Sequence, residues 1–318
     1  MIMKYTENYK LKMPEGNDYV SVDDFNENFN AVDKELAQQK SDFTEHKEHG
    51  VNNNILINSN FANPVNQRGK TTYNAITGNA EYTIDRWNTF GTSAYPTDVI
   101  VSSDYVRFST KMNASGFVQK VEFPEKYRGK KLTLSAEFSN IAGNLSLVIA
   151  DGVDASQVNI VNDGVYEFTH IVASNATLLQ VYVKNVSANG SVSSCDIKWM
   201  KLEIGDHATP YVPRLYAEEL ALCRWYYSTD LLHDAIAVRK ETDNLAFEKV
   251  LGKMRLERPT VTLKNCGIRN NYQEVGDFTF TADSFNEFVD IYCDKTNHGL
   301  VDSHTVQVIG TVIRDAEL

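Results

Sequence analysis

The sequence predicts a mainly β protein that begins with an α-helical coiled coil, continues into an antiparallel β-sandwich and ends in a smaller β domain. Three observations support this prediction. Apolar residues near the N-terminus recur at alternating steps of three and four, the spacing of a coiled coil. From residue 55 the pattern changes to alternation with period two. Clusters of Asn, Asp and Gly separate these runs, as turns separate short strands.

The composition excludes several classes of protein. The 318 residues are 42% hydrophobic and 23% charged, which is typical of a globular protein with room for two packed domains. A net charge of -11 argues against nucleic acid or an anionic membrane as the main partner. No run of 18 apolar residues is present, so we expect no membrane insertion. The N-terminus lacks the apolar core of a signal peptide, so we expect no secretion signal.

Residues 1–20 show no periodicity and contain Pro14 and Gly16, so we expect an extended segment. Residues 21–50 then form the predicted helix. Ser21 and Asp24 make a capping box at its start, and Gly50 ends it. Its a/d seam consists of Val22, Phe25, Phe29, Val32, Leu36, Gln39 and Phe43.

This helix either packs on its own domain or self-associates. Two positions in seven are apolar, a narrower stripe than a helix on a globular core usually shows. Gln39 is a polar seam residue of the kind that sets register and oligomer number. Roughly three heptads are too short to be stable alone in water. We therefore favour an oligomeric coiled coil, and a homotrimer over a dimer.

Residues 53–212 are predicted to form the antiparallel sandwich. The predicted strands are 99–108, 132–138, 145–150, 165–172, 178–186 and 192–202. No helical pattern lies between them, which favours a sandwich over a parallel sheet.

Residues 213–318 are predicted to form the smaller β domain. One helix is expected at 218–228, ending in Trp225, Tyr226 and Tyr227, which favour an interface between domains or protomers. The strands expected after it are 236–239, 245–250, 260–263, 277–282, 287–293 and 306–314, with polar loops at 265–271 and 294–303.

Catalytic motifs are absent from the sequence. It contains no P-loop, GxGxxG, HExxH or GxSxG, and its four cysteines form no CxxC pair, so we expect no cofactor, no metal and no catalytic residues. Paired carboxylates can hydrolyse glycosides, and the candidates are Asp85, Asp151, Asp154 and Glu203. No spacing among them specifies catalysis, so turn or surface roles are favoured.

The sandwich contains two tryptophans, Trp87 and Trp199. An exposed tryptophan can stack on a sugar ring, whereas a buried one packs the core. The apolar residues around both favour core packing. In the strand 192–202, however, neither face is cleanly apolar.

Several blocks together resemble tail fibres from prophages of Gram-positive gut bacteria. They are residues 10–20, 22–29, 55–61, 63–69, 82–87, 201–210, 218–224 and 315–318. The resemblance implies a baseplate-attachment segment at residues 1–20, a central module like a carbohydrate-binding jelly roll, and a C-terminal tip that faces the host. Residues 58–61 and 85–87 mix turn formers with apolar anchors, and we interpret them as fold-defining.

The expected function is therefore adhesion. The protein would be a tail fibre or receptor-binding protein of a phage or tailocin, made in the bacterial cytoplasm, with a baseplate protein and a bacterial surface glycan or protein as partners. Loops on a rigid scaffold are where binding usually lies. The receptor-binding candidates in the tip are Tyr272, Tyr292, Asp294, Asn297 and His298. The sandwich is the competing binding site, and a cell-wall or capsule polysaccharide hydrolase on the same particle is the alternative function.

Overall fold

The structure is a computed structural model that describes residues 4–6, 11–13, 21–50, 53–232, 238–240, 244–251, 253–256, 258–270, 273–274, 280–284, 288–294 and 306–317. The chain divides into two compact units. One comprises Met1–Asn52 with Thr209–Val212, and the other Asn53–Ala208 with Pro213–Leu318. Within the described residues, no helix combines the length and the apolar character needed to cross a membrane.

The N-terminal unit contains a long helix and two short strands. Helix α1 spans Val22–Gly50, as the sequence predicts, and β1 (Lys4–Tyr5) pairs antiparallel with β2 (Lys12–Met13). The predicted capping box is present, because the Asp24 amide donates to Ser21 Oγ at 3.2 Å and the Ser21 amide donates to Asp24 Oδ2 at 3.3 Å. Lys12 Nζ lies 2.6 Å from Asp24 Oδ1, which ties β2 to the first turn of the helix.

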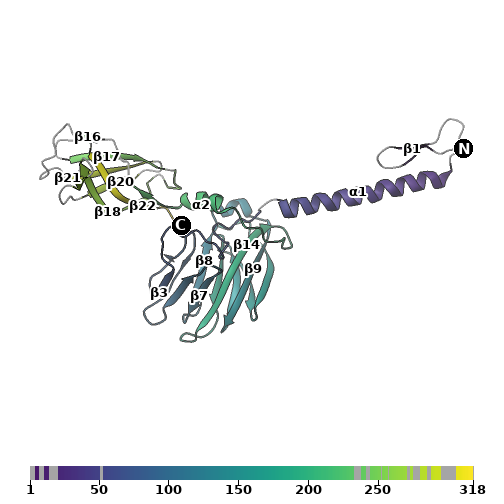
Figure 1. The fold of residues 1–318 in the computed structure, drawn as a ribbon. Helices are drawn as coiled ribbons and strands as arrows, with labels where there is room; N and C mark the ends of the chain where they lie inside the picture. The colour runs from purple at the N-terminus through teal and green to yellow at the C-terminus, as the bar shows by residue number, and fades with distance from the viewer. Residues whose placement is uncertain are drawn as a thin grey trace. The chain divides into compact units, whose positions relative to one another are not determined.

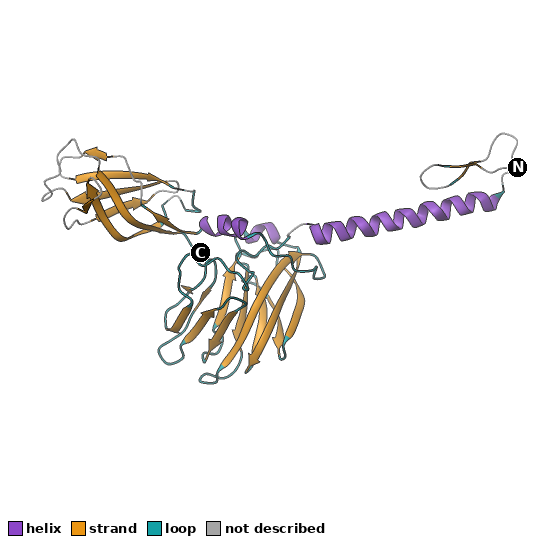
Figure 2. Ribbon diagram, in the orientation of Figure 1, coloured by secondary structure: helices purple, strands orange, loops and turns teal. Residues whose placement is uncertain are grey.

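The second unit begins with the predicted β-sandwich, which is confirmed (Figures 1 and 2). One six-stranded antiparallel sheet has the order β11 (Ala155–Ile160), β10 (Leu145–Ala150), β13 (Gln180–Asn185), β8 (Gly116–Lys120), β5 (Asn88–Thr89) and β4 (Glu81–Tyr82). The other has the order β12 (Gly164–Ile171), β9 (Lys131–Ala142), β14 (Ser193–Ile204), β7 (Val106–Thr110), β6 (Thr97–Val101) and β3 (Thr72–Ile76). A short 3-10 helix, η1, spans Pro124–Tyr127.

The sandwich is held by one large apolar core between its sheets. Trp87 lies in it with no exposed surface, stacked on Phe117 at a centroid distance of 4.9 Å and edge-on to Phe61 at 5.0 Å. The prediction that Trp87 packs the core is confirmed. Trp199 is half-buried, and its indole N–H donates to Glu137 Oε2 at 2.7 Å. The Trp87 indole therefore offers no open face for a sugar.

A β-bulge in β14 explains the mixed faces of its sequence. The pairing of β14 with β9 shifts register between Ile197 and Trp199. Before the shift Cys195 and Ile197 face the core, and after it Met200 and Leu202 do. A bulge adds one residue to a strand, so the alternation changes phase.

Another predicted strand of the sandwich is wrong in its extent. The run 99–108 forms two strands, β6 and β7, because it contains a turn in which the Ser102 amide donates to the Tyr105 carbonyl at 2.9 Å. Ser102, Ser103 and Asp104 are residues that favour turns.

The C-terminal part begins with α2 (Tyr216–Arg224), so the helix predicted at 218–228 ends four residues earlier than expected. Tyr227 instead begins β15 (Tyr227–Leu231). Two four-stranded sheets follow. The first has the order β15, β22 (Val306–Asp315), β18 (Thr260–Asn270) and β19 (Gln273–Glu274). The second has the order β16 (Val238–Lys240), β17 (Asn244–Val250), β21 (Phe288–Asp294) and β20 (Phe280–Ser284).

The polar run predicted as a loop at 265–271 is mostly strand, because β18 continues to Asn270. The register of β18 against β22 shifts between Lys264 and Gly267, so the polar residues lie at a bulge. Gly310 faces this bulge, and a Cβ there would lie only 2.6 Å from Cys266 Sγ. The opposite strand therefore requires glycine.

Candidate functional site

The apolar stripe of α1 is exposed to solvent in the single chain. Its exposed fractions run from 39% at Val32 to 74% at Val22, and Phe25, Phe29 and Leu36 lie between these values. A helix packed on its own domain would bury such residues. Gln39 and Phe43 also belong to α1, but their side chains lie outside the described residues. The stripe is therefore available to another chain.

The receptor-binding candidates of the tip are described only in part. Tyr292 lies in β21, half-buried and opposite Thr281 of β20. Asp294 ends β21 opposite Asn244, with its side chain outside the described residues. Tyr272, Asn297 and His298 also lie outside the described residues. The tip site stays a prediction.

A groove of about 340 Å³ lies on the sandwich, on the outer face of the sheet that contains β8 and β13. Sequence reasoning missed it, although six of its residues belong to the alternating strands β8 and β13. Its lining is Asn88, Phe90, Ala114, Gly116, Val118, Lys120, Gln180, Tyr182 and Lys184.

The strand register places these side chains together. In β13, Val181 and Val183 belong to the core, so Gln180, Tyr182 and Lys184 point outward. Tyr182 pairs with Val118 of β8, and Val118 pairs with Asn88 of β5. Side chains opposite each other in a sheet lie about 5 Å apart, so these residues form a continuous row across three strands.

A glycine opens the floor of the groove beside the tyrosine. A Cβ on Gly116 would lie 3.5 Å from Tyr182 Cδ2 and 3.0 Å from the Val183 carbonyl oxygen. Any larger residue would therefore crowd the β13 backbone and cover the adjacent edge of the ring. Burial raises the pKa of the Tyr182 hydroxyl, so this group remains a neutral donor and acceptor at physiological pH. The ring and its hydroxyl together offer an apolar face with a polar end.

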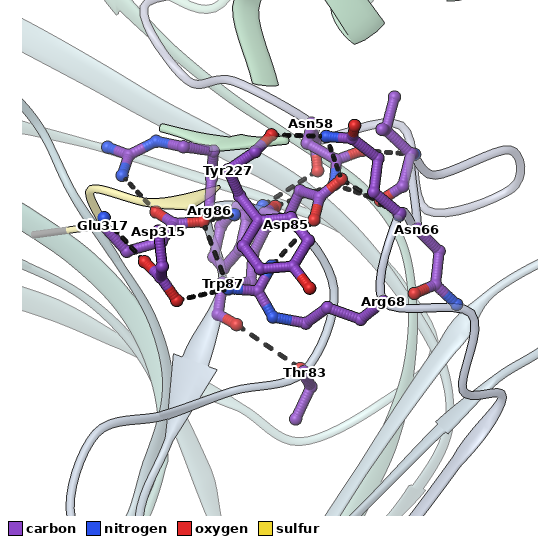
Figure 3. A network of polar contacts seen from close by, with 12 residues as sticks. Asn58, Asn66, Arg68, Thr83, Asp85, Arg86, Trp87, Tyr227, Asp315 and Glu317 are labelled. Atoms are coloured by element: carbon purple, nitrogen blue, oxygen red, sulfur yellow. Dashed lines mark hydrogen bonds and ion pairs between the residues drawn. The ribbon is translucent and has the colours of Figure 1, made fainter. Parts of the chain in front are cut away.

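A second cluster joins the sandwich to the C-terminal sheets, and it is built from buried charges (Figure 3). Arg86 donates from Nη1 to Glu317 Oε2 at 2.8 Å, and its backbone amide donates to Glu317 Oε1 at 3.0 Å. The Arg86 guanidinium also lies 3.5 Å from the centroid of the Tyr226 ring. Tyr226 in turn donates to Glu122 Oε2 at 2.7 Å. Both Arg86 and Glu317 are almost fully buried.

Asp85 extends this cluster toward the start of the sandwich. Arg68 Nη1 donates to Asp85 Oδ1 at 2.8 Å, and the Arg68 guanidinium lies 3.8 Å from the centroid of the Tyr227 ring. Burial raises the pKa of Asp85 to about 6, although Arg68 and two hydrogen bonds from Gln67 oppose the shift. Asn58 donates from Nδ2 to the backbone carbonyl of Asp85 at 2.8 Å.

Residues from distant parts of the sequence meet in this cluster. Asn58 has a left-handed backbone (φ 57), which asparagine tolerates better than most residues. Its backbone N–H donates a hydrogen bond to the Glu219 carboxylate of α2. Residues 58–61, 85–87, 219 and 317 thus contact one another although they are far apart in sequence. Their contacts tie together distant segments of the second unit.

The candidate carboxylates have partners of their own or lie in turns. Asp85 and Glu203 are buried, Glu203 Oε2 lies 3.2 Å from Lys201 Nζ, and Asp154 is exposed in a turn. Neither these residues nor Asp151 line the groove.

Asp151 belongs to a hydrogen-bonded chain of three side chains. His170 Nε2 lies 3.1 Å from Asp151 Oδ2, and His170 Nδ1 lies 3.0 Å from Ser156 Oγ. Burial would raise the pKa of Asp151, but hydrogen bonds from three backbone amides and His170 lower it to about 2. Ser156 pairs with the core residue Ile149, so its side chain points between the sheets. The hydrogen bond between Ser156 and His170 links the edge strands β11 and β12.

No family model and no curated protein matches the chain. Among solved structures, it is similar to one described as CBM4, with 18% identity and a TM-score of 0.32 over 41% of this chain and 94% of the other. It is similar to the C-terminal family 22 carbohydrate binding module of Clostridium thermocellum Xyn10B, with 14% identity and a TM-score of 0.30 over 43% and 94%. The binding domain of botulinum neurotoxin DC matches with 5% identity and a TM-score of 0.25 over 78% and 95%. Similarity at this level identifies neither a family nor a ligand.

Proposed function

We propose that this protein is a glycan-binding adhesin that serves as a trimeric tail fibre or receptor-binding protein of a phage or tailocin. The observation that carries the binding function is the groove around Tyr182. It combines an aromatic ring, a glycine that leaves the ring accessible, and polar side chains from adjacent strands. Sites with an apolar surface and a few well-placed polar groups are typical of small-ligand and saccharide recognition.

The groove suits a saccharide in particular. The half-buried Tyr182 ring provides a flat face for the C–H surface of a sugar ring. Gln180 presents an amide group that can donate and accept hydrogen bonds with hydroxyls, whereas Asn88 is buried and hydrogen-bonded to Tyr82. All of these side chains lie on strands, which hold them more rigidly than loops would.

The exposed stripe of α1 supports the trimer. A 29-residue helix with Phe25, Phe29 and Leu36 exposed buries them by associating with copies of itself. Three linked chains carry three grooves, and weak sites bind strongly when they are linked. Adhesion therefore needs only modest affinity at each groove.

The resemblance of residues 10–29 to tail-fibre attachment segments supports attachment to a baseplate protein. The same resemblance implies that the C-terminal sheets form a host-facing tip, and the loop argument places the candidates Tyr292 and Asp294 in it. A contact through the tip is compatible with glycan binding in the sandwich, and the adsorption that Tyr182→Ala retains measures the contribution of the tip.

The alternative function is hydrolysis of a cell-wall or capsule polysaccharide. It is less well supported, because the groove is lined by no carboxylate and the candidate carboxylates have other partners. Incubation of the purified protein with envelope polysaccharide tests it directly. New reducing ends would favour the hydrolase, and their absence together with binding would favour the adhesin.

The binding function is tested with a panel of bacterial surface polysaccharides and three proteins: the wild type, Tyr182→Ala and Tyr105→Ala. Tyr105 is half-buried in a hairpin of the other sheet, so its variant is a matched control. We expect Tyr182→Ala to lose about ten-fold in affinity, since an aromatic contact of this kind is worth about 1.4 kcal/mol. Equal binding by all three proteins would contradict a site at the groove.

A further inference from the structure

We propose that the groove is selective for an anionic glycan, one that carries carboxylate or phosphate groups along its chain. This inference rests on the proposed function, since it names the class of glycan that the groove around Tyr182 takes. It concerns the charge of the groove, which is opposite in sign to the net charge of the chain.

The groove is cationic in an anionic protein. The chain carries a net charge of -11, yet the groove is lined by Lys120 and Lys184 and by no acidic residue. Neither lysine takes part in an ion pair with any of the residues that the structure describes. Both lysines are half-buried, so their aliphatic stems lie along the sheet and their ammonium groups remain available to a ligand.

The absence of acidic groups extends beyond the groove across the sheet face. The strand register aligns outward side chains of β11, β10, β13 and β8 in three rows. The first row consists of Asn159, Ser146, Lys184 and Gly116; the second of Gln157, Val148, Tyr182 and Val118; the third of Ala155, Ala150, Gln180 and Lys120. None of these residues is acidic. A polyanion can therefore lie across the four strands without meeting a like charge.

The two lysines stand on either side of the tyrosine. Lys184 follows Tyr182 by two residues on β13, and Lys120 of β8 pairs with Gln180, which precedes Tyr182 by two. With about 3.4 Å per residue along a strand and about 5 Å between opposite side chains, their Cβ atoms lie roughly 14 Å apart. At this distance they contact separate anionic groups, so a polymer with a repeated charge fits better than a single anion. The Tyr182 ring then contacts the sugar between these groups.

The test uses two anionic polymers and one neutral control. Polygalacturonate supplies carboxylates, poly(glycerol phosphate) supplies phosphodiesters, and fully methyl-esterified polygalacturonate keeps the sugar backbone of the first without its charge. Affinities of the full chain are measured for the wild type, Lys120→Gln/Lys184→Gln, Lys130→Gln/Lys131→Gln and Tyr182→Ala. Lys130 and Lys131 are exposed elsewhere on the sandwich, so their variant has the same net charge without altering the groove.

We expect the wild type to bind at least one anionic polymer about ten-fold more tightly than the neutral one, with a preference that weakens as salt is added. The groove variant should lose this preference and keep its affinity for the neutral polymer, whereas the control variant should match the wild type. The polymer that binds more tightly tells whether carboxylate or phosphate is recognised.

Three results would overturn the inference. They are equal affinity of the wild type for charged and neutral polymers, no binding of the wild type to either anionic polymer, or an undiminished preference of Lys120→Gln/Lys184→Gln for the anionic polymer. The Tyr182→Ala arm separates this failure from that of the proposed function. If Tyr182→Ala loses binding to a neutral glycan that the wild type binds, the groove is a glycan site without charge selectivity. If it binds every glycan as the wild type does, the proposed site itself is wrong.

Discussion

Removal of the Glu317 carboxylate should destabilise the protein strongly, although Glu317 is next to the last residue of the chain. In the variant Glu317→Ala, the Arg86 guanidinium loses its Nη1 hydrogen bond at 2.8 Å and the Arg86 amide loses its acceptor at 3.0 Å. Arg86 is only 2% exposed, so water cannot replace the carboxylate. Arg86 also adopts a left-handed backbone (φ 72), which its contacts with Glu317 help to hold.

The magnitude follows from the burial of the pair. Removing one partner of a buried ion pair costs about 3–5 kcal/mol, because a charge stays behind without compensation. Arg86 keeps a hydrogen bond from Nη2 to the Lys120 carbonyl at 2.9 Å and its contact with the Tyr226 ring. Because these contacts remain, we expect the loss to lie at the lower end of this range, at about 3 kcal/mol in the free energy of unfolding.

Urea unfolding followed by tryptophan fluorescence measures this loss, because Trp87 is adjacent to Arg86 in the core. The matched control is Glu125→Ala, which removes the same side chain from an exposed position in η1. The double variant Arg86→Met/Glu317→Ala removes the stranded charge and should recover part of the stability. The reasoning is refuted if Glu317→Ala lies within about 0.5 kcal/mol of the wild type, or if the double variant is no more stable than Glu317→Ala.

Three further predictions concern assembly, pH and domain division. Phe29→Asp/Leu36→Asp places six charges in a trimeric seam, so sedimentation should show monomers, and an unchanged trimer would contradict the coiled coil. Between about pH 4 and pH 6 the folded protein retains a proton on Asp85 that the unfolded chain has released, so the contribution of Asp85 to stability should fall by up to about 3 kcal/mol as pH rises. Urea midpoints across this range should be flatter for Asp85→Asn, and parallel curves would contradict the shift. A fragment of residues 53–318, which keeps the Arg86–Glu317 contacts, should give a β-type circular dichroism spectrum and a cooperative melt without α1, and an unfolded spectrum would contradict this division of the chain.

The sequence predicted those parts of the fold that depend on local pattern. The strand Leu145–Ala150 was predicted with its correct bounds, and the capping box of Ser21 and Asp24 marked the start of α1. Such signals come from neighbouring residues, which alternate across a strand or meet within one helical turn. Short strands such as β4 and β5, each of two residues, carry too little pattern to be found.

The groove and the charged cluster escaped prediction because both depend on pairing between distant segments. Arg86 and Glu317 are 231 residues apart in sequence, and neither has a local pattern that indicates a partner. Tyr182 and Asn88 join one row only through the register of β13, β8 and β5. A shift of one residue would turn each side chain to the opposite face, so the row cannot be read before the register is known. The bulge in β14 had the same effect on its apolar face.

The most direct test of the central proposal is the affinity of the wild type and Tyr182→Ala for surface polysaccharide purified from Gram-positive bacteria to which the wild type adsorbs. Isothermal titration with folded, trimer-matched samples measures it without contributions from the rest of the cell. Loss of about ten-fold in affinity, with Tyr105→Ala unchanged, is the result that the groove predicts. An affinity of Tyr182→Ala equal to that of the wild type would contradict the proposed site and place recognition elsewhere in the chain.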